Sequence, residues 1–595
     1  MDIRNINISG PAANLTDECI YQANQQDYLV LKVGRHLEGR LYLVAFSVLA
    51  VLDSMLRTLT AGGIALWALF TMDGDRAAFA GRIMGCAGLL LLAGLSLPVG
   101  LFDPHMTVRR FIRHTPSADE VVVYGQQHRA KGVKVETPRT ERELQAIFAN
   151  PAYKHAKFSI AGARMSQGGH ILPGGDEWAL KVMIDMREFN QVKVHESRRT
   201  AVVGAGATWE QVHEKVNSKG RAVRVAQASP IFSLGGSLSV NCHGWDHTAG
   251  ALADTVNWID VMTVDGKVHR TRPGEDLFKA VVGGFGTCGA ILRAELKLAR
   301  NETLLRKGVD TKLSEYVEHF RTLQGQDSDC RMQLGRLSLI PSKWNHVTSL
   351  EYRKDPNCHH GVVSQLNPES DRGLLKERVM LEIGRSSTAA RDMASDLEKK
   401  DLSKEVRITR NEEMRPPIRS ILNEARNDTE WLQEYFIAPD KLERFVKFLG
   451  RVLHKNDVRL LNASIRYVQH PGSKASPFMD YAPTERFAIV LFFNQLRSPE
   501  AIAKTQRWVR QVNHKLIAMG GTFYLPYAQL ATQDQFTRAY GEGAEQVQRV
   551  RREVDPKGRL VSQFSEKYLP RHAEAKRDDH HGQRARRRHT SLERQ

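Results

Sequence analysis

The stretch FSIAGARMSQGGH, residues 158–170, decides how the rest of the chain is interpreted. It begins as a short β-rich run, and its three glycines leave the backbone free to bring consecutive N–H groups together around an anion. These glycines are Gly162, Gly168 and Gly169. Ser166 and Gln167 can add side-chain donors to a pyrophosphate, and Arg164 can add charge or form a structural ion pair. The stretch therefore indicates an anion cradle, with an ordinary glycine-rich turn as the alternative.

A second segment of small polar residues follows at 233–266, SLGGSLSVNCHGWDHTAGALADTVNWIDVMTVDG. A large, flat, polar cofactor needs close backbone contacts along its length, and small residues permit them. The residues of this kind are Gly235, Gly236, Ser237, Ser239, Asn241, His243 and Gly244, followed by Asp254. The two segments together favour a cofactor cradle over a simple turn.

Two further glycine runs have part of the spacing of a Rossmann turn. In VVGGFGTCGAI, Gly284, Gly286 and Gly289 satisfy G-x-G-x-x-G, but that motif needs a strand before it and a helix after it. Here GEDLFKAVV is typical of a helix and residues 290–298 alternate as a strand, so the order is reversed. In VVGAGATW, Trp209 stands where a third glycine would be. Both runs are interpreted as close backbone turns that can face a ligand.

The length and the charge of the chain limit its class. A chain of 595 residues is too long for one core, so two or more domains are expected. The net charge of +18 suits nucleic acid, a membrane surface or an anionic ligand. Neither zinc-finger spacing nor an RNA-binding aromatic motif is found, so nucleic-acid binding is not expected. The six cysteines form no C-x-x-C pair, which argues against a zinc site or a disulfide framework, and no metal site is predicted.

The first hundred residues indicate a membrane anchor. Residues 83–102, IMGCAGLLLLAGLSLPVGLF, form an uncharged run about long enough to cross the hydrocarbon core, and residues 54–72 form a weaker second span. Basic residues on both flanks favour a hairpin with both ends in the cytoplasm. Because a polar segment precedes the apolar block, a retained anchor in the inner membrane is preferred to a signal peptide. A buried helical pair in a soluble protein is the alternative.

Beyond residue 119 the pattern predicts an α+β fold. Short β-rich runs separated by glycine turns continue to about residue 300. Residues 430–526 then predict the order β-α-β-β-α-β of a ferredoxin-like antiparallel sheet, which can cap a cofactor. The second helix of this unit begins with Ser498 as its N-cap and Pro499 at its first position.

Five motifs together resemble a known family. FSIAGARMSQGGH, AVVGAGATWEQV, GGSLSVNCHG, ADTVNWIDVMTVDG and VGGFGTCGAI, in this order, resemble the PCMH-type FAD-binding domain of the vanillyl-alcohol-oxidase class. Within that class the chain is most similar to aldonolactone and alditol oxidases, decaprenylphosphoryl-ribose oxidase and the sterol side-chain reductases. The expected organisation is a polar segment 1–40, membrane-anchor helices 41–102, a linker 103–118, an FAD-binding domain 119–300, a substrate-binding cap 301–526, a return to the FAD-binding domain 527–570 and a disordered basic tail 571–595.

The resemblance implies which residues bind FAD. The cradle for the pyrophosphate consists of Ala161, Gly162, Ala163, Arg164, Met165, Ser166, Gln167, Gly168, Gly169 and His170. The flavin and adenosine parts are approached by Gly235, Gly236, Ser237, Ser239, Gly244, Asp254, Gly284, Gly286, Gly289 and Ile291. Sugar and lactone oxidases of the class often have, at the position of Met165, a histidine bonded to the flavin. The resemblance therefore implies non-covalent FAD in this chain.

The resemblance also implies hydride transfer to flavin N5 from a C–H next to a hydroxyl of a sugar, polyol, lactone or lipid-linked sugar. Arg466 matches the cap-strand arginine that points at the flavin in lactone and alditol oxidases, but Ser464 stands where these enzymes have a glutamate. Tyr527 stands where decaprenylphosphoryl-ribose oxidase has a lysine. Arg466, Tyr527 and His243 are the predicted catalytic residues. A salt-bridged strand arginine and a structural histidine are the alternatives.

Four further residues are predicted to contact the substrate, namely Gln433, Tyr435, Tyr524 and Gln529. On the strand WLQEYFI, Gln433 and Tyr435 share one face, so Glu434 is expected to point away from the site. Two other hypotheses remain, a flavin-dependent alkene reductase and a membrane scaffold that has lost turnover. The scaffold hypothesis is motivated by the missing glutamate and lysine. The electron acceptor, oxygen or a quinone, is left open.

Overall fold

The computed structural model describes residues 120–124, 128–325, 329–357, 362–363, 366–367, 381, 385, 388–416, 428–470 and 474–571. The predicted anchor 41–102 lies outside these residues, as do the polar segment, the linker and nearly all of the basic tail. In the part of the chain that is described, no helix is both long enough and apolar enough to cross a bilayer.

The chain divides into two compact units. One contains Met1–Thr115, Leu422–Glu430 and Gln495–Thr505, and in it the hydroxyl of Thr505 donates to the side-chain oxygen of Gln495 (2.6 Å). The other contains Pro116–Ile421, Trp431–Asn494 and Gln506–Gln595, and it holds the site described below.

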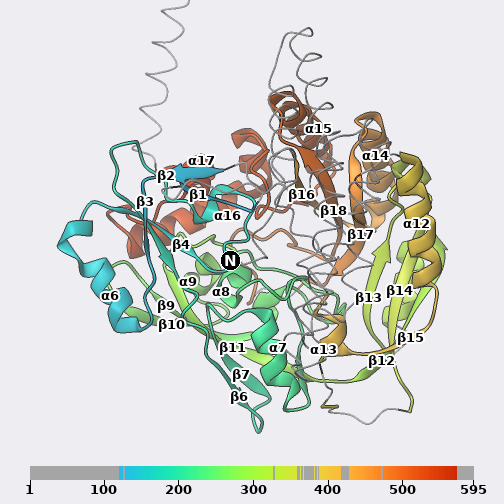
Figure 1. Ribbon diagram of the computed structural model, residues 1–595, viewed down its shortest axis with the longest axis horizontal. Coiled ribbons are helices and arrows are strands. Elements are labelled where there is room, and N and C mark those ends of the chain that lie inside the picture. The colour runs from blue at the N-terminus through green and yellow to red at the C-terminus, as the bar shows by residue number, and fades with distance from the viewer. Residues whose placement is uncertain are drawn as a thin grey trace, which may run out of the picture. The chain divides into compact units, whose positions relative to one another are not determined.

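A three-stranded parallel sheet places the cradle. Its order is β3 (Val133–Glu136), β5 (Lys181–Asp185), β4 (Lys157–Ala161), and helix α6 (Glu141–Ala149) follows β3 (Figure 1). The central strand β5 is buried from Val182 to its end because both neighbours and both faces cover it. Phe158 on β4 packs at the centre of this core, edge-on to Phe148 of α6. Strand β4 ends at Ala161, so the cradle begins at the carboxyl edge of this sheet.

A six-stranded sheet is formed by strands that follow in the sequence. Its strand β9 belongs to the second polar segment, residues 233–266. The order is β10 (Val268–Thr271), β9 (Val256–Met262), β11 (Ala290–Arg300), β7 (Thr200–Gly204), β6 (Val192–His195), with β8 (Arg221–Val223) also paired to β11. Helix α9 (Asp276–Val281) precedes the third glycine run and β11 follows it. The interpretation of this run as something other than a Rossmann turn is therefore confirmed.

An eight-stranded sheet contains the predicted β-α-β-β-α-β unit. The elements of that unit are β16 (Asp428–Ile437), α14 (Leu442–Lys455), β17 (Arg459–Val468), β18 (Arg486–Leu496), α15 (Pro499–Ala518) and β19 (Thr522–Phe523). Four more strands extend the sheet beyond β17, in the order β13 (Cys330–Arg336), β14 (His346–Lys354), β12 (Thr303–Lys312) and β15 (Val406–Thr409). Helices α10 (Tyr316–Gly325), α12 (Thr388–Leu402) and α13 (Arg410–Glu413) complete this part. The sequence pattern alone did not reveal these four strands.

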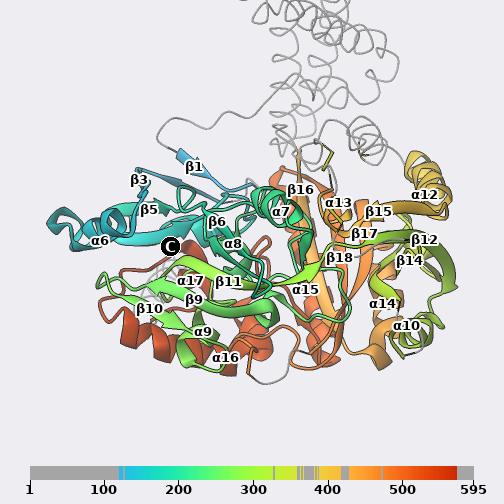
Figure 2. The same ribbon diagram turned by 90° about the horizontal axis from the view of Figure 1, so that it is seen from below.

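The C-terminal helices return to the first sheet. Helix α16 (Gln533–Val554) lies along α9, and α17 (Gln563–Tyr568) follows it (Figure 2). Between them, Phe158 of β4 donates its N–H to Arg559 O (2.6 Å) and accepts from Val561 N (2.9 Å). The Arg559 guanidinium also lies over the Phe158 ring. Residues 559–562 therefore lie beside β4, directly before the cradle.

Candidate functional site

The cradle loop has a backbone conformation suited to an anion. Arg164 has a φ of +60°, a left-handed conformation that is uncommon for a residue with a side chain. In the described chain, no hydrogen bond occupies the backbone N–H groups of Arg164, Met165, Ser166 and Gly168. Consecutive N–H groups beside a left-handed residue form a concave donor site for phosphate oxygens. This run of open donors is the observation in the structure that fits the pyrophosphate of FAD.

The side chains of the cradle are mostly engaged within the protein. The Arg164 guanidinium binds the buried carboxylate of Asp185 at 2.5 Å, which makes it the structural ion pair that the sequence left open. Burial alone would raise the pKa of Asp185, but Arg187 and Arg164 hold that pKa below its usual value. The Ser166 hydroxyl donates to Gly168 O (3.0 Å). The hydroxyl is therefore used within the loop, and the donor that Ser166 can offer to the pyrophosphate is its backbone N–H.

His170 is enclosed rather than presented to a ligand. Its ring packs against those of Phe285 and Phe564, at centroid distances of 5.0 and 4.5 Å, and its Nε2 lies 3.0 Å from Leu525 O. Burial lowers the pKa of His170 to about 3, so the ring is neutral at physiological pH. Its predicted contact with FAD is limited to the backbone, because the ring belongs to the core.

The other predicted cofactor residues lie on α8 (Leu234–Ser239), on the loops that follow it, and around the start of β11. Ser237 is buried, accepts a hydrogen bond from Trp209 Nε1 (2.9 Å) and donates to Gln227 (2.9 Å), so its side chain is structural. A Cβ added to Gly284 would lie 1.8 Å from Ala280 O, so this glycine is required by packing. Gly236 is more open, and its N is 3.8 Å from a Cβ placed on Gly162. The placements are Gly235, Gly236, Ser237 and Ser239 on α8, Gly244 after it, Asp254 in the turn before β9, Gly284, Gly286 and Gly289 before β11, and Ile291 on β11.

A buried polar cluster is centred on Glu434 of strand β16. His243 Nε2 is 2.5 Å from Glu434 Oε1, and the Tyr527 hydroxyl donates to Glu434 Oε2 at 3.0 Å. Both His243 and Glu434 are buried, with exposed fractions of 5% and 2%. We name this set of three residues the polar cluster. It joins two of the predicted catalytic residues, His243 and Tyr527, through a carboxylate that the sequence had not placed there.

The prediction that Glu434 points away from the site is therefore wrong. Tyr435, predicted to face the substrate, is instead fully buried and packs edge-on against Phe445 of α14. The assignment failed because β16 is buried almost throughout, so the alternation of its residues does not show which face is polar. A charged residue on such a strand is itself the missed signal, because a buried carboxylate requires partners.

Arg466 lies on the same side as the polar cluster. It is half-buried on β17, and within the described chain it forms neither a hydrogen bond nor an ion pair. Burial lowers the pKa of Arg466, while the nearby charge of Glu434 raises it. Burial also raises the pKa of Tyr527 well above its ordinary value, so its hydroxyl stays protonated. The guanidinium thus brings positive charge beside Glu434 without being neutralised by a direct partner.

The cradle and the polar cluster touch one another. Gln167 of the cradle accepts a hydrogen bond from Leu432 N (2.9 Å), two residues before Glu434. A Cβ added to Gly168 would lie 2.8 Å from the backbone oxygen of Tyr527. Gln167 therefore binds the sheet of the cluster instead of serving only as a donor to the cofactor. These contacts place the anion-binding loop and the polar cluster in one continuous site.

The remaining predicted substrate residues either support the polar cluster or border the cradle. The Tyr524 hydroxyl donates to Val240 O (2.9 Å), and its N–H donates to Glu434 O (2.9 Å), so Tyr524 supports the cluster. Gln433 and Gln529 are buried, and each has a side-chain Nε2 without a hydrogen-bond partner in the described structure. The Gln529 amide lies 3.4 Å from a Cβ placed on Gly169, so it borders the cradle. In the described residues, no group of three or more His, Cys, Asp or Glu side chains is placed to hold a metal ion.

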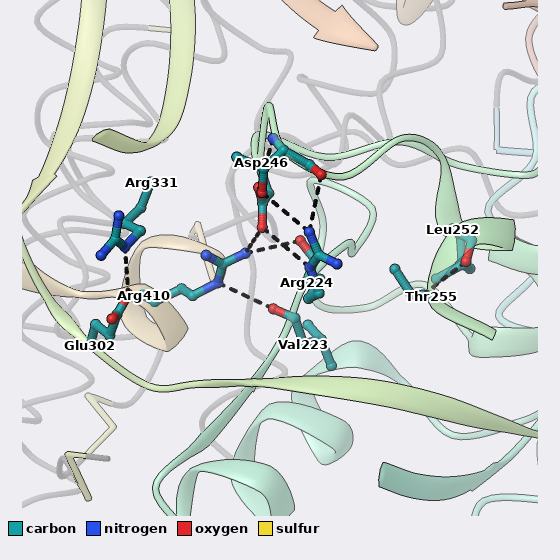
Figure 3. A network of polar contacts seen from close by, with 9 residues as sticks. Val223, Arg224, Asp246, Leu252, Thr255, Glu302, Arg331 and Arg410 are labelled. Atoms are coloured by element: carbon teal, nitrogen blue, oxygen red, sulfur yellow. Dashed lines mark hydrogen bonds and ion pairs between the residues drawn. The ribbon is translucent and has the colours of Figure 1, made fainter. Parts of the chain in front are cut away.

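A buried ion pair fixes the loop that follows His243. Figure 3 shows Arg410 of α13 reaching Asp246 at 2.6 Å and the backbone oxygens of Val223 and Arg224 at 3.3 and 3.2 Å. Asp246 in turn accepts from the Thr248 N–H and hydroxyl. Burial would raise the pKa of Asp246, but Arg410 keeps that pKa below its usual value. The loop that carries His243 is therefore held between β8 and α13.

Comparisons with known proteins agree with this geometry. Residues 134–272 match the family described as FAD binding domain. Decaprenylphosphoryl-beta-D-ribose oxidase of Mycolicibacterium smegmatis is 30% identical over 147 residues, which are 24% of this chain and 31% of that protein. Alditol oxidase of a Streptomyces species is 29% identical over 170 residues, 28% of this chain and 38% of that protein. Berberine bridge enzyme-like 6 of Arabidopsis thaliana is 29% identical over 191 residues, 28% of this chain and 35% of that protein.

The chain thus carries an FAD-binding domain of the PCMH type, as the five motifs predicted, and FAD is its cofactor. It spans about a third of the length of these curated relatives. The open N–H groups of the cradle and the small residues around α8 fit the pyrophosphate and the planar parts of that cofactor.

Proposed function

We propose that this protein is a membrane-anchored FAD-dependent oxidoreductase that removes hydride from a C–H next to a hydroxyl of a sugar, polyol, lactone or lipid-linked sugar. The observation that carries the proposal is the polar cluster, a buried carboxylate bound to a histidine and a tyrosine beside the FAD cradle. The relatives named as an alditol oxidase and a decaprenylphosphoryl-ribose oxidase support this class of substrate.

In the proposed reaction, FAD supplies the hydride acceptor. Glu434 accepts the Nε2–H of His243, which fixes the tautomer and leaves Nδ1 as the free base. That Nδ1 is buried and has no hydrogen-bond partner in the described structure. Nδ1 takes the proton of the substrate hydroxyl, and the Glu434 carboxylate stabilises the imidazolium that forms.

Arg466 and Tyr527 set the electrostatics of this step. The Tyr527 hydroxyl holds the second oxygen of Glu434, so the carboxylate keeps the orientation that His243 needs. The unneutralised Arg466 guanidinium stabilises negative charge as it develops next to the cluster. The scaffold hypothesis was motivated in part by the missing glutamate at position 464. The presence of the Glu434 carboxylate in the polar cluster weakens that reason.

The test is anaerobic reduction of the bound flavin. The full chain, purified in detergent, is expected to show a flavin spectrum that candidate polyols, aldoses or lactones bleach without oxygen. Protein without bound flavin, or flavin that no member of these classes reduces, would contradict the proposal. A flavin that is instead reoxidised by an alkene would favour the reductase hypothesis. The rates at which oxygen and a quinone reoxidise the reduced flavin then identify the electron acceptor.

Two further parts of the proposal have separate tests. Met165 in the cradle supports non-covalent FAD, because a thioether cannot form the histidyl bond to the flavin. Acid precipitation should therefore release the flavin into the supernatant, and a yellow pellet would contradict this. We also propose that residues 41–102 attach the protein to the inner membrane with its catalytic domain in the cytoplasm, supported by the apolar run at 83–102. Alkaline extraction of membranes should leave the protein in the pellet.

A further inference from the structure

An exposed tryptophan marks one end of the three-stranded parallel sheet. Trp178 is 87% exposed, the highest value among the large hydrophobic residues of the described chain. Leu180, two residues later, is 42% exposed, and Val135 on the neighbouring strand β3 is 38% exposed. Single exposed apolar residues are ordinary, whereas a tryptophan with a neighbouring aliphatic residue at one edge indicates a contact surface. Val135 pairs with Met183, further along the sheet, so we name only Trp178 and Leu180 the apolar edge.

The turn that carries Trp178 is held in place. The Trp178 N–H donates to Asp176 Oδ1 and the Ala179 N–H donates to Asp176 O, each at 3.2 Å. On one side of the turn, Gly174 N donates to Val561 O (2.9 Å), and on the other, Leu180 O accepts from Lys157 N (2.9 Å). The indole is therefore presented by an ordered turn.

The strand register shows that the apolar edge and Glu120 lie at the same end of the sheet. Val133, Lys181 and Lys157 are the first residues of β3, β5 and β4, and they are directly paired across the sheet. Glu120, the first described residue, pairs with Lys131, only two residues before Val133. The described chain thus begins, at Glu120, at the same edge of the sheet as Trp178.

The charges around the apolar edge suit an anionic surface. Lys131, Lys134 and Lys154 are exposed at this end, and the side chain of Lys134 is 57% exposed. Lys134 is paired with Glu136 (3.2 Å), and the acidic residues on or against the Trp178 turn are Asp176, whose side chain is used in the turn, Glu177, and Glu566, whose carboxylate accepts from the Gly175 N–H. Tryptophan is favoured at the level of lipid headgroups, and nearby lysines interact with anionic lipids. The cradle lies at the opposite edge of the same sheet, because it follows the last residue of β4.

We infer that the apolar edge rests on a phospholipid bilayer, with Trp178 and Leu180 in the interfacial region and the surrounding lysines on anionic headgroups. The inference rests on the membrane attachment proposed above and is independent of the flavin chemistry. It fixes the orientation of the domain, with the amino edge of the parallel sheet toward the lipid and the cradle away from it.

The test is quenching of tryptophan fluorescence in vesicles. The full chain is reconstituted in phosphatidylcholine and phosphatidylglycerol vesicles that contain lipids brominated near the headgroup, and Trp178→Phe is subtracted from the unmodified protein. The difference signal should fall about twofold or more relative to unbrominated vesicles, as for a residue in the interface. Trp258→Phe is the matched control, because Trp258 of β9 packs against Arg270 of β10 and its signal should not change.

Each alternative outcome overturns the inference in a distinguishable way. If the protein floats with the vesicles but aqueous acrylamide quenches Trp178 and brominated lipid does not, the edge faces water while the attachment stands. If neither agent quenches Trp178, another protein or a second copy covers the edge. If the protein does not float, the attachment fails together with the inference, and the flavin assay in detergent is unaffected.

Discussion

The cradle and the polar cluster share one site but are built from different parts of the chain. The cradle is a single loop whose donors are backbone N–H groups, and its side chains are engaged by Asp185, Leu432 and their own loop. The polar cluster is made of three side chains from segments far apart in sequence, His243, Glu434 and Tyr527. In the function proposed above, these two parts have different roles, which are binding of the cofactor and proton transfer beside it.

This difference predicts two classes of variant. A change in the cradle disturbs backbone geometry, so it should weaken FAD binding and leave the chemistry of the bound flavin nearly intact. A change in the polar cluster removes a proton acceptor or its support, so it should slow flavin reduction while FAD stays bound. A cluster variant that loses FAD, or a cradle variant that slows only the chemistry, would break the distinction.

The largest effect is expected for Glu434→Gln. The amide keeps the size of the side chain but cannot stabilise the imidazolium of His243, so the rate of flavin reduction should fall about 10²–10⁴-fold. FAD content, read from the absorbance ratio of flavin to protein, should not change. The matched control is Glu443→Gln on the exposed side of α14, which loses only a surface ion pair with Lys447. Equal rates for the two variants would remove Glu434 from the reaction.

The next largest effect is expected for Gly168→Ala. The new Cβ would lie 2.5 Å from the His170 ring and 2.8 Å from Tyr527 O, so the loop must move away from the cluster. FAD affinity should fall about 10–100-fold, or about 1.4–2.8 kcal/mol, measured by titration of the apoprotein with FAD. Gly325→Ala is the control, since nothing lies within 4 Å of its added Cβ. Unchanged affinity would show that this glycine does not shape the cradle.

The same comparison explains what the sequence could predict. The cradle was identified because glycine spacing within one continuous stretch reports a local backbone conformation, and the left-handed Arg164 and the open N–H groups agree with it. The β-α-β-β-α-β order was identified because helix and strand periodicities differ. Local patterns of this kind require no knowledge of tertiary contacts.

The polar cluster could be predicted only in part. His243 and Tyr527 were selected through the resemblance, but their common partner was assigned to the wrong face of β16, where burial on both sides hides the alternation. Strands β12 to β15 were also missed, and the pairings that join them into one sheet include distant segments, such as Thr303 of β12 with Thr409 of β15. Contacts between distant segments depend on tertiary packing, which no local pattern specifies.

A smaller effect is expected for Tyr527→Phe. This change removes the hydrogen bond to Glu434 Oε2 but leaves His243 on Oε1, so the orientation of the base is loosened and not abolished. The rate of flavin reduction should fall about tenfold, in line with about 1.5 kcal/mol for one hydrogen bond to a charged group. Stopped-flow reduction of the bound flavin measures this rate. Tyr435→Phe, on the helix side of β16, is the control and should leave the rate unchanged.

The smallest effect is expected for Asp254→Asn, and it is an effect on the free energy of unfolding. Burial, followed by the charge of Asp480, raises the pKa of Asp254 to about 7. The folded state therefore holds a proton that the unfolded state has lost, so this residue makes the protein less stable as pH rises from about 4 to about 7. Asp254→Asn removes the titration. The variant should gain about 1–2 kcal/mol over the unmodified protein between pH 5 and pH 8, a value reduced because Asp254 is only half-buried.

Asp265 provides the control of opposite sign for this experiment. Burial alone would raise the pKa of Asp265, but hydrogen bonds from the Thr263 hydroxyl and the Lys267 N–H together hold that pKa below its usual value. Its carboxylate therefore stabilises the folded state above its unfolded pKa, and that contribution is lost as pH falls. Urea denaturation of Asp265→Asn should show a loss of stability at pH 8, where Asp254→Asn shows a gain. Parallel behaviour of the two variants would mean that Asp254 is ionised in the folded protein, which would contradict its raised pKa.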